Sequence, residues 1–188
     1  MDSPAHRRAE RGITLLEMVT GMGIVAVLAS IAIPSYKYVT NANRIAAEVN
    51  GLLGDMQYAR AEAMKEGSTV TVCVSSDGAT CAGTTTWQSG WIVFSDVNGD
   101  ATVDAGDTVL RVQSAFAGSD TFLASNAASY VMFNREGFAT GADIAAGTLI
   151  TLHATPVSSA STRCLSVTLV GLMAVQTYNQ TVNGFTCT

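Results

Sequence analysis

The stretch ITLLEMVTGMGIVAVLASIAI, from Ile13 to Ile33, decides the fold of this chain of 188 residues, because it holds only one charged side chain, Glu17. As a helix rising about 1.5 Å per residue it spans about 30 Å, the thickness of the hydrocarbon core of a bilayer. Three arginines stand among the twelve residues before it, and positive charges hold the end that carries them in the cytoplasm. The sequence therefore predicts one membrane span, with the rest of the chain on the far side.

Three interpretations of this segment compete: a secretory signal cut after Ser30-Ile31-Ala32, a plain membrane anchor, and a type IV prepilin signal. Glu17 decides between them, because an ionised carboxylate near one end of a spanning helix is costly and marks a function. A disposable signal peptide has no use for it, and leucine would serve a plain anchor better. The sequence favours the prepilin signal.

The residues around Glu17 resemble the type IV pilin consensus. GITLLE (residues 12–17) has a Gly, an apolar residue after it, and Glu at the fifth place of the mature chain, and Ala29–Tyr36 is similar to the same family's helix. The resemblance implies cleavage between Gly12 and Ile13 by a prepilin peptidase, and N-methylation of Ile13. The usual first mature residue is Phe, so Ile13 departs from the pattern, but the Gly is the stricter requirement.

The resemblance also gives Glu17 a physical role in subunit assembly. In pilin-like filaments the N-terminal helices bundle into an apolar core, where a buried carboxylate needs a partner charge. The free amine of Ile13 on a neighbouring subunit supplies that charge and fixes the axial register. We therefore expect other pilins or pseudopilins to be partners of this chain through its N-terminal helix.

Beyond Pro34 the helical pattern changes from wholly apolar to amphipathic. Apolar residues recur at spacings of three and four, which predicts a helix face packed on a sheet. The stripe consists of Ile45, Val49, Leu52, Leu53, Met56, Ala59 and Ala63. One helix is expected from about Ile13 to about Glu66, with Gly67 as its C-cap.

From Ser68 onward the apolar residues recur with a period of two, which is typical of strands. The strand candidates are Thr69–Val74, Gly90–Ser95, Thr108–Gln113, Tyr130–Asn134, Thr148–Ala154 and Arg163–Gln176, the last a hairpin broken near Gly171. Residues 75–86, 115–129 and 155–162 are rich in small and polar residues and are predicted to be loops.

The expected fold class is therefore α+β, with a long N-terminal helix that spans the membrane in its first half and packs against antiparallel β-sheet. Four parts are predicted along the chain. They are a prepilin leader (1–12), a transmembrane or filament-core helix (13–34), its amphipathic continuation (35–67) and a β-rich globular domain (68–188).

Several segments resemble the FimT/GspH family of minor pilins and pseudopilins. They are Gly90–Asp96, the turn Asn98-Gly99-Asp100, Asp104–Arg111, Phe133–Ala139, Arg163–Val167, Gly171 and the closing Cys187. Their order behind a pilin signal makes the resemblance specific. It implies a pilin-like fold and a minor pilin that takes part in type IV pilus assembly, as an initiation or tip component. The alternative is a GspH-type minor pseudopilin of a type II secretion system.

The predicted location is the inner membrane, crossed once, with the globular domain in the periplasm before incorporation into a pilus or pseudopilus. That compartment is oxidising, so four cysteines suggest two disulfides, for which three connectivities are possible. Cys73–Cys81, which closes a short loop after the first strand, and Cys164–Cys187, which matches the family pattern, are favoured.

Five polar residues follow the spacing of a calcium-binding EF-hand loop at positions 1, 3, 5, 9 and 12. They are Asp96, Asn98, Asp100, Asp104 and Asp107. The sixth place holds Ala101 instead of Gly, and the twelfth holds Asp instead of the longer Glu. A solvated hairpin loop built on Asn98-Gly99 is the favoured interpretation, so calcium stays a weak candidate and no metal is assigned.

Composition and charge argue against other functions. Apolar residues make up 48% of the chain and charged residues 13%, which excludes general disorder. Removing residues 1–12 leaves seven bases against thirteen acids, and the stretch where some FimT proteins carry a DNA-binding Gly-Arg-x-Arg is here Gly171-Leu172-Met173-Ala174. Both features argue against DNA binding. No base–nucleophile pair stands beside His153, so we expect no enzyme, and nothing implies a cofactor.

Overall fold

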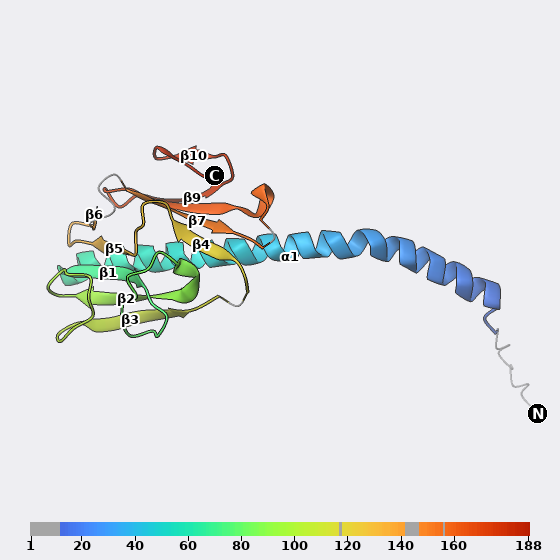
Figure 1. Cartoon of the computed structure of the whole chain (residues 1–188), viewed down its shortest axis with the longest axis horizontal. Helices are drawn as coiled ribbons and strands as arrows, with labels where there is room; N and C mark the ends of the chain where they lie inside the picture. The colour runs from blue at the N-terminus through green and yellow to red at the C-terminus, as the bar shows by residue number, and fades with distance from the viewer. Residues whose placement is uncertain (1–11, 117, 142–146, 156) are drawn as a thin grey trace, which may run out of the picture. The chain divides into compact units, whose positions relative to one another are not determined.

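The computed structural model describes residues 12–116, 118–141, 147–155 and 157–188, so the predicted leader lies outside the described residues except for Gly12. One helix, α1, runs from Leu15 to Glu66 and continues through Pro34 (Figure 1). The chain divides into two compact units, Met1–Thr40 and Asn41–Thr188. Helix α1 contributes its first part to one unit and its last part to the other.

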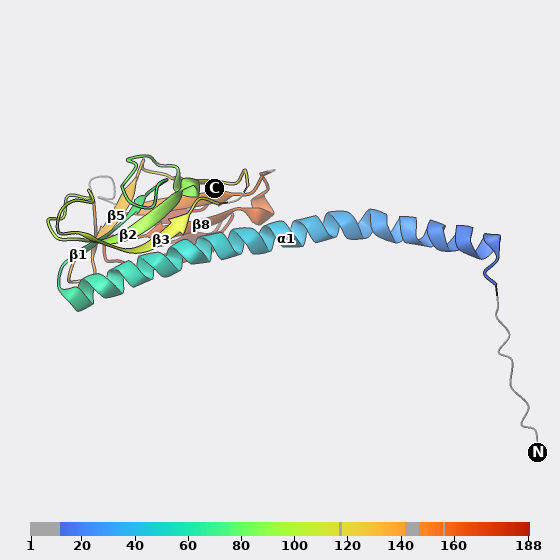
Figure 2. The ribbon, with the colours of Figure 1, turned by 90° about the horizontal axis from the view of Figure 1, so that it is seen from below.

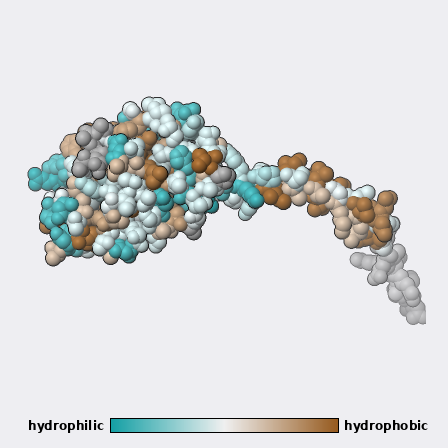
Figure 3. All heavy atoms as spheres, viewed as in Figure 1, coloured by the Kyte–Doolittle hydropathy of each residue, from teal (hydrophilic) through white to brown (hydrophobic). Residues whose placement is uncertain are grey.

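In the first unit, the described part of α1 is an apolar helix with exposed side chains. An 18-residue window of α1 has a mean hydropathy of 2.1, and none of that window is buried. Figure 3 shows hydrophobic side chains along much of this part of the helix. By length and composition, α1 is the one helix among the described residues that is able to cross a membrane. A helix that is apolar all round needs lipid or other helices around it.

In the second unit, the amphipathic part of α1 packs one stripe onto the sheets, as predicted, and Figure 2 shows it lying along the strands. The buried residues of α1 are Ile45, Val49, Leu52, Met56, Ala59 and Ala63. The helix ends at Glu66 because Gly67 has a φ of +68° and donates its backbone N–H to the Ala63 carbonyl at 3.0 Å. A glycine in the left-handed region is a common end for a helix.

Two antiparallel sheets make up most of the second unit. The first has the strand order β3-β2-β1-β5-β6, the second has the order β4-β7-β8-β9, and β10 and β11 form a separate hairpin. The strands are β1 (Thr69–Val74), β2 (Gly90–Asp96), β3 (Thr108–Ser114), β4 (Thr121–Ala124), β5 (Tyr130–Phe133), β6 (Ala139–Thr140), β7 (Thr148–His153), β8 (Arg163–Val167), β9 (Met173–Thr177), β10 (Thr181–Val182) and β11 (Phe185–Thr186). Short 3-10 helices cover Trp87–Ser89 and Ser159–Ser161.

One hydrophobic core joins α1 to both sheets. It includes the helix stripe, alternate residues of β1 such as Val70 and Val72, and alternate residues of β7 such as Ile150 and Leu152. Each sheet also carries a small apolar cluster on its outer face, and each of these clusters contains disulfide-bonded cysteines. The disulfides therefore hold a loop on one sheet and the C-terminal tail on the other.

The segment 115–129, predicted to be a loop, is the main correction to the sequence analysis. It contains strand β4, which pairs with β7 in the second sheet. Phe122 of β4 is fully buried, and its ring lies 6.3 Å from that of Trp91. Four residues among small and polar neighbours are too few to show a period of two. The two-residue strands β6, β10 and β11 were hidden for the same reason, whereas β8 and β9 form the predicted hairpin.

Candidate functional site

The predicted processing and assembly residues lie at the start of α1. Gly12 and Ile13 precede the helix, and Ile13 is 71% exposed. Thr14 caps the first turn, because its Oγ1 accepts the backbone N–H of Glu17 at 3.2 Å. Glu17 is thereby held in the first turn, where the helix dipole favours a negative charge.

The Glu17 carboxylate makes no hydrogen bond or ion pair with any residue that the structure describes. It lines a groove of about 550 Å³ on one face of the helix, together with Ile13, Met18, Gly21 and Met22. Gly21 stands one turn after Glu17 and brings no side chain to the groove, so a neighbouring helix has room beside the carboxylate. The face is suited to another apolar helix that carries one positive charge.

The loop 97–107, which holds most of the weak calcium candidates, is folded around its own backbone. The carboxylate of Asp96, fully buried at the end of β2, accepts the Thr71 hydroxyl and three consecutive backbone N–H groups of the loop at 2.7–3.2 Å. Asp107 accepts two more N–H groups, and the Asn98 amide joins two other carboxylates. Among the described residues no group of three or more His, Cys, Asp or Glu is placed to hold a metal ion. The contacts are those of a hairpin loop.

A junction that the sequence analysis missed ties α1 to the ends of both sheets. Arg60 donates its Nε to the Gly137 carbonyl of the β5–β6 turn at 2.9 Å and its Nη2 to the Val170 carbonyl of the β8–β9 turn at 3.4 Å. Gly171 has a φ of +72°, and a Cβ there would lie 2.3 Å from the Gly137 oxygen. Only a glycine lets the two turns approach this closely.

Asp55 makes a second tie between α1 and the first sheet. Its carboxylate accepts the Nε1 of Trp91 and the Nη1 of Arg111, both at 2.9 Å. The Arg111 guanidinium also lies 3.7 Å from the centre of the Tyr58 ring. Trp91 therefore packs in the core and anchors the helix at the same time.

A third tie lies where α1 enters the second unit. Arg44 pairs with the buried Asp120 at 2.7 Å, and Asp120 also accepts the backbone N–H of Thr155 at 2.9 Å. Glu48 is 3.9 Å from Arg44, and one of its oxygens is buried without a hydrogen-bond partner among the described residues. Burial, and then the nearby Asp120, raise the pKa of Glu48 above its ordinary value.

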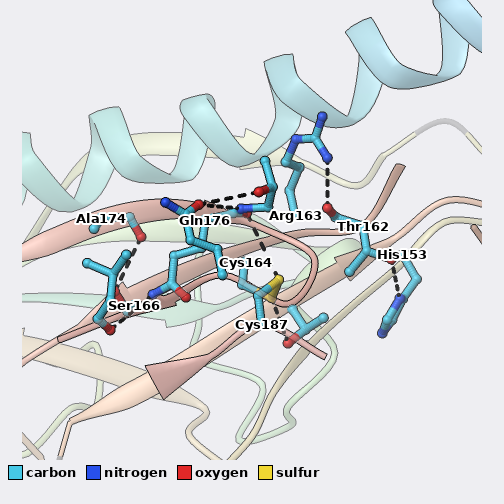
Figure 4. The surroundings of a disulfide bond; sticks show 12 residues. His153, Thr162, Arg163, Cys164, Ser166, Ala174, Gln176 and Cys187 are labelled. Carbon is cyan, nitrogen blue, oxygen red and sulfur yellow. Dashed lines mark hydrogen bonds between the residues drawn. A yellow bond between two sulfur atoms is a disulfide. The ribbon is translucent and has the colours of Figure 1, made fainter. Parts of the chain in front are cut away.

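The structure joins Cys73 to Cys81 and Cys164 to Cys187. The first bond closes the loop after β1. The second fixes the C-terminal tail over β8, on the outer face of the second sheet (Figure 4). Gln176 of β9 is fully buried and donates its amide to a carbonyl of β10 at 3.3 Å. The tail is therefore an ordered part of the second unit.

The residues considered for catalysis and DNA binding occupy structural places. The Nδ1 of His153 lies 3.2 Å from the Thr162 hydroxyl, which joins β7 to the start of β8 (Figure 4). Gly171–Ala174 forms the end of the β8–β9 turn and the start of β9, with no arginine in it.

An apolar N-terminal helix that continues into a unit where it packs on antiparallel sheets defines a pilin-like protein with a membrane-anchoring helix and a globular domain. Residues 48–171 match the family described as Type II transport protein GspH, and the chain belongs to that family.

One solved structure supports the same fold. The crystal structure of the type IV minor pilin FimU of Pseudomonas aeruginosa in space group P21 matches with a TM-score of 0.55 at 19% identity, covering 71% of this chain and 89% of that chain. A second crystal form of FimU, in space group P65, gives a TM-score of 0.48 at 18% identity, covering 73% and 90%. None of the curated proteins matches this sequence.

Proposed function

We propose that this chain is a minor pilin that enters a type IV pilus through its N-terminal helix, at or near the tip, where it helps to initiate assembly. The observation that carries the proposal is the exposed apolar surface of the first part of α1, up to Ile33. Glu17, in the first turn, is the one carboxylate in that part. Such a surface is satisfied by lipid before assembly and by other helices after it.

A minor pseudopilin of a type II secretion system is the second candidate. The family description, Type II transport protein GspH, favours it, whereas the related fold of FimU, itself described as a type IV minor pilin, favours the pilus. Glu17 and the apolar helix serve either filament equally, because both are built from bundled N-terminal helices.

Maturation by a prepilin peptidase is part of the proposal. The enzyme cuts between Gly12 and Ile13, and the new N-terminus of Ile13 is methylated. The place of this bond supports the step, because Gly12 and Ile13 are exposed and precede the first helical residue, Leu15. Before assembly the chain is anchored in the inner membrane, with its second unit in the periplasm.

Glu17 is proposed to pair with the N-terminal amine of a neighbouring subunit. Glu17→Ala is expected to leave cleavage and membrane insertion intact but to lower the amount in sheared filaments at least about tenfold, since removing one partner of a buried pair leaves the other uncompensated. Thr20→Ala is the matched control, because Thr20 is exposed on the same helix and its hydroxyl bonds only to the helix's own carbonyls. Normal incorporation of Glu17→Ala would count against this role.

Deletion of the gene separates the two candidate machines when surface pili and secreted exoprotein are measured in the same strain. Fewer sheared pili with normal secretion supports the minor pilin. Exoprotein retained in the periplasm with normal pili assigns the chain to the pseudopilus instead. If pili and secretion both stay normal in the deletion strain, and restoring the wild-type gene alters neither, the proposed function is wrong.

A further inference from the structure

Exposed apolar side chains gather at the end of the second unit where α1 ends. We call this set the end patch: Met64, Phe138, Leu169, Val170 and Leu172. Figure 1 shows the end of α1 and β6 at this same end of the unit. The backbone N–H of Ala139 donates to the Leu169 carbonyl at 2.8 Å, which joins the turn that carries Phe138 to the β8–β9 turn. Exposed apolar side chains that gather at one place are a feature of interaction sites.

A groove of about 320 Å³ adjoins the end patch, between α1 and the β8–β9 turn. Ala61 and Met64 line it from the helix, and Leu172 and Met173 line it from the turn and β9. Arg60 is the only charged residue among its lining residues. The Nε and Nη2 groups of Arg60 are held by carbonyls, and its Nη1 bonds to no group among the described residues.

The charge of Arg60 is unusual in this unit because no carboxylate neutralises it. Four other cations each have a carboxylate within 3 Å, in the pairs Arg44–Asp120, Lys65–Glu62, Arg111–Asp55 and Arg135–Glu136. Arg60 makes no ion pair among the described residues. Arg163 also donates only to carbonyls, but it stands at the opposite end of β8 from the groove.

We propose that the groove and the end patch dock a neighbouring subunit of the same filament, through an acidic side chain flanked by apolar residues. The acid pairs with Arg60, and its apolar neighbours cover the end patch. The inference rests on the proposed function, because it requires a filament neighbour.

The charge pattern favours a protein partner over other ligands. Nucleic acids and anionic membranes are held by several basic groups together, and here one cation stands alone beside an apolar surface. A free carboxylate metabolite would fill the groove but would leave the end patch exposed. A protein segment with one acid satisfies both parts, as in interfaces with an apolar centre and few, well-placed charges.

The test uses the full-length chain in its own cells, with a photo-crosslinking amino acid in place of Leu172. The matched control carries the same probe in place of Leu123, another exposed leucine, which lies on β4. We expect the Leu172 probe to crosslink one subunit that has a pilin-type signal, next to an Asp or Glu of that subunit, and the Leu123 probe not to do so.

Charge variants then test the predicted acid. Met64 is 48% exposed, so it tolerates both Met64→Glu and Met64→Lys, which are similar in size and helix propensity. We expect Met64→Glu to lower the Leu172 crosslink about tenfold by repelling the acid, and Met64→Lys to keep it. Arg60→Gln, which retains a donor for the Gly137 carbonyl, is expected to lower the crosslink as much as Met64→Glu does.

Several outcomes would overturn the proposal. They are a Leu172 crosslink no stronger than the Leu123 control, a crosslinked product that is nucleic acid or a protein without a pilin-type signal, and equal losses in the two Met64 variants. If Arg60→Gln fails to accumulate, the Met64 pair still decides. If gene deletion impairs pili or secretion while the crosslink is absent, docking is wrong and the proposed function stands. If deletion impairs neither pili nor secretion, the proposed function is wrong, whatever the crosslink shows.

Discussion

Replacing Gly171 with alanine tests whether the junction around Arg60 holds the second unit together. The added Cβ would lie 2.3 Å from the Gly137 carbonyl oxygen and 2.8 Å from the Nε of Arg60. Both neighbours belong to one hydrogen bond, from Arg60 to Gly137 at 2.9 Å. The methyl group therefore has to push apart the two turns or displace the arginine, and either movement weakens the contact of α1 with the ends of both sheets.

The expected loss of stability is the sum of three parts. An alanine at a φ of +72° costs about 1–2 kcal/mol, and overpacking a close contact costs about 1–3 kcal/mol. Weakening a hydrogen bond from a charged group adds roughly 1 kcal/mol. We expect the free energy of unfolding to fall by about 3–6 kcal/mol, which lowers the melting temperature of a protein of this size by roughly 10–20 °C.

The assay is thermal unfolding of the full-length protein in detergent under non-reducing conditions, followed by tryptophan fluorescence, because Trp87 and Trp91 both lie in the core of the second unit. Gly184→Ala is the matched control: Gly184 has a φ of +83°, but nothing lies within 4 Å of the added Cβ. Gly184→Ala introduces only the backbone strain, so we expect it to melt about 3 °C below the wild type. If Gly171→Ala melts at the same temperature as Gly184→Ala, the reasoning about the close approach is wrong.

Three further predictions concern the other ties in the fold. Replacing Cys164 and Cys187 by alanine should lower the free energy of unfolding, measured with denaturant, by about 3.5 kcal/mol. This loss should exceed that from removing Cys73–Cys81 by about 1 kcal/mol, because the bonded cysteines are 23 residues apart instead of 8. Equal losses would contradict this. Trp91→Phe removes the 2.9 Å bond to Asp55 and should cost about 1–2 kcal/mol in the same assay, whereas an unchanged midpoint would show that the bond is dispensable. Burial raises the pKa of Glu48, so the stability linked to its protonated form is present below the ordinary value of 4.5 and is lost as the pH rises through the raised value. Glu48→Gln should therefore lose less stability than the wild type between acid and neutral pH, and parallel pH profiles would refute the assignment.

The main elements of this fold follow from local patterns. The helix stripe and the longer strands were predicted from spacings of three to four and of two, because each element buries one face and is long enough for the repeat to show. Strand β4 was not predicted, because it is four residues long and stands among small polar residues. Its burial depends on pairing with β7, a contact between distant parts of the chain. Strands β10 and β11 likewise have only two residues each. They pair with each other in the tail that the Cys164–Cys187 disulfide joins to β8.

The residues of the candidate site also differ in how far local sequence patterns predict them. Glu17 was predicted because it is a charge inside an apolar run, and Gly12 and Ile13 were predicted from the resemblance of residues 12–17 to the type IV pilin consensus. The acidic loop, by contrast, has the spacing of a calcium site, but the spacing does not reveal that Asp96 points inward. The backbone N–H groups of the loop and the Thr71 hydroxyl take up that carboxylate.

The unpaired charge of Arg60 can be predicted from the sequence only in part. On a helix, ion pairs form between residues three or four positions apart. Lys65 has Glu62 at such a spacing, and its pair forms at 2.7 Å. The four positions at these spacings from Arg60 are occupied by Met, Gln, Ala and Met, so no helix neighbour can neutralise it. The sequence thus identifies Arg60 as the arginine of α1 without a local partner. Only the fold adds that carbonyls of two distant turns hold Arg60 beside an apolar groove. This combination of a lone cation with an apolar surface makes the end of the second unit suited to an acidic neighbour.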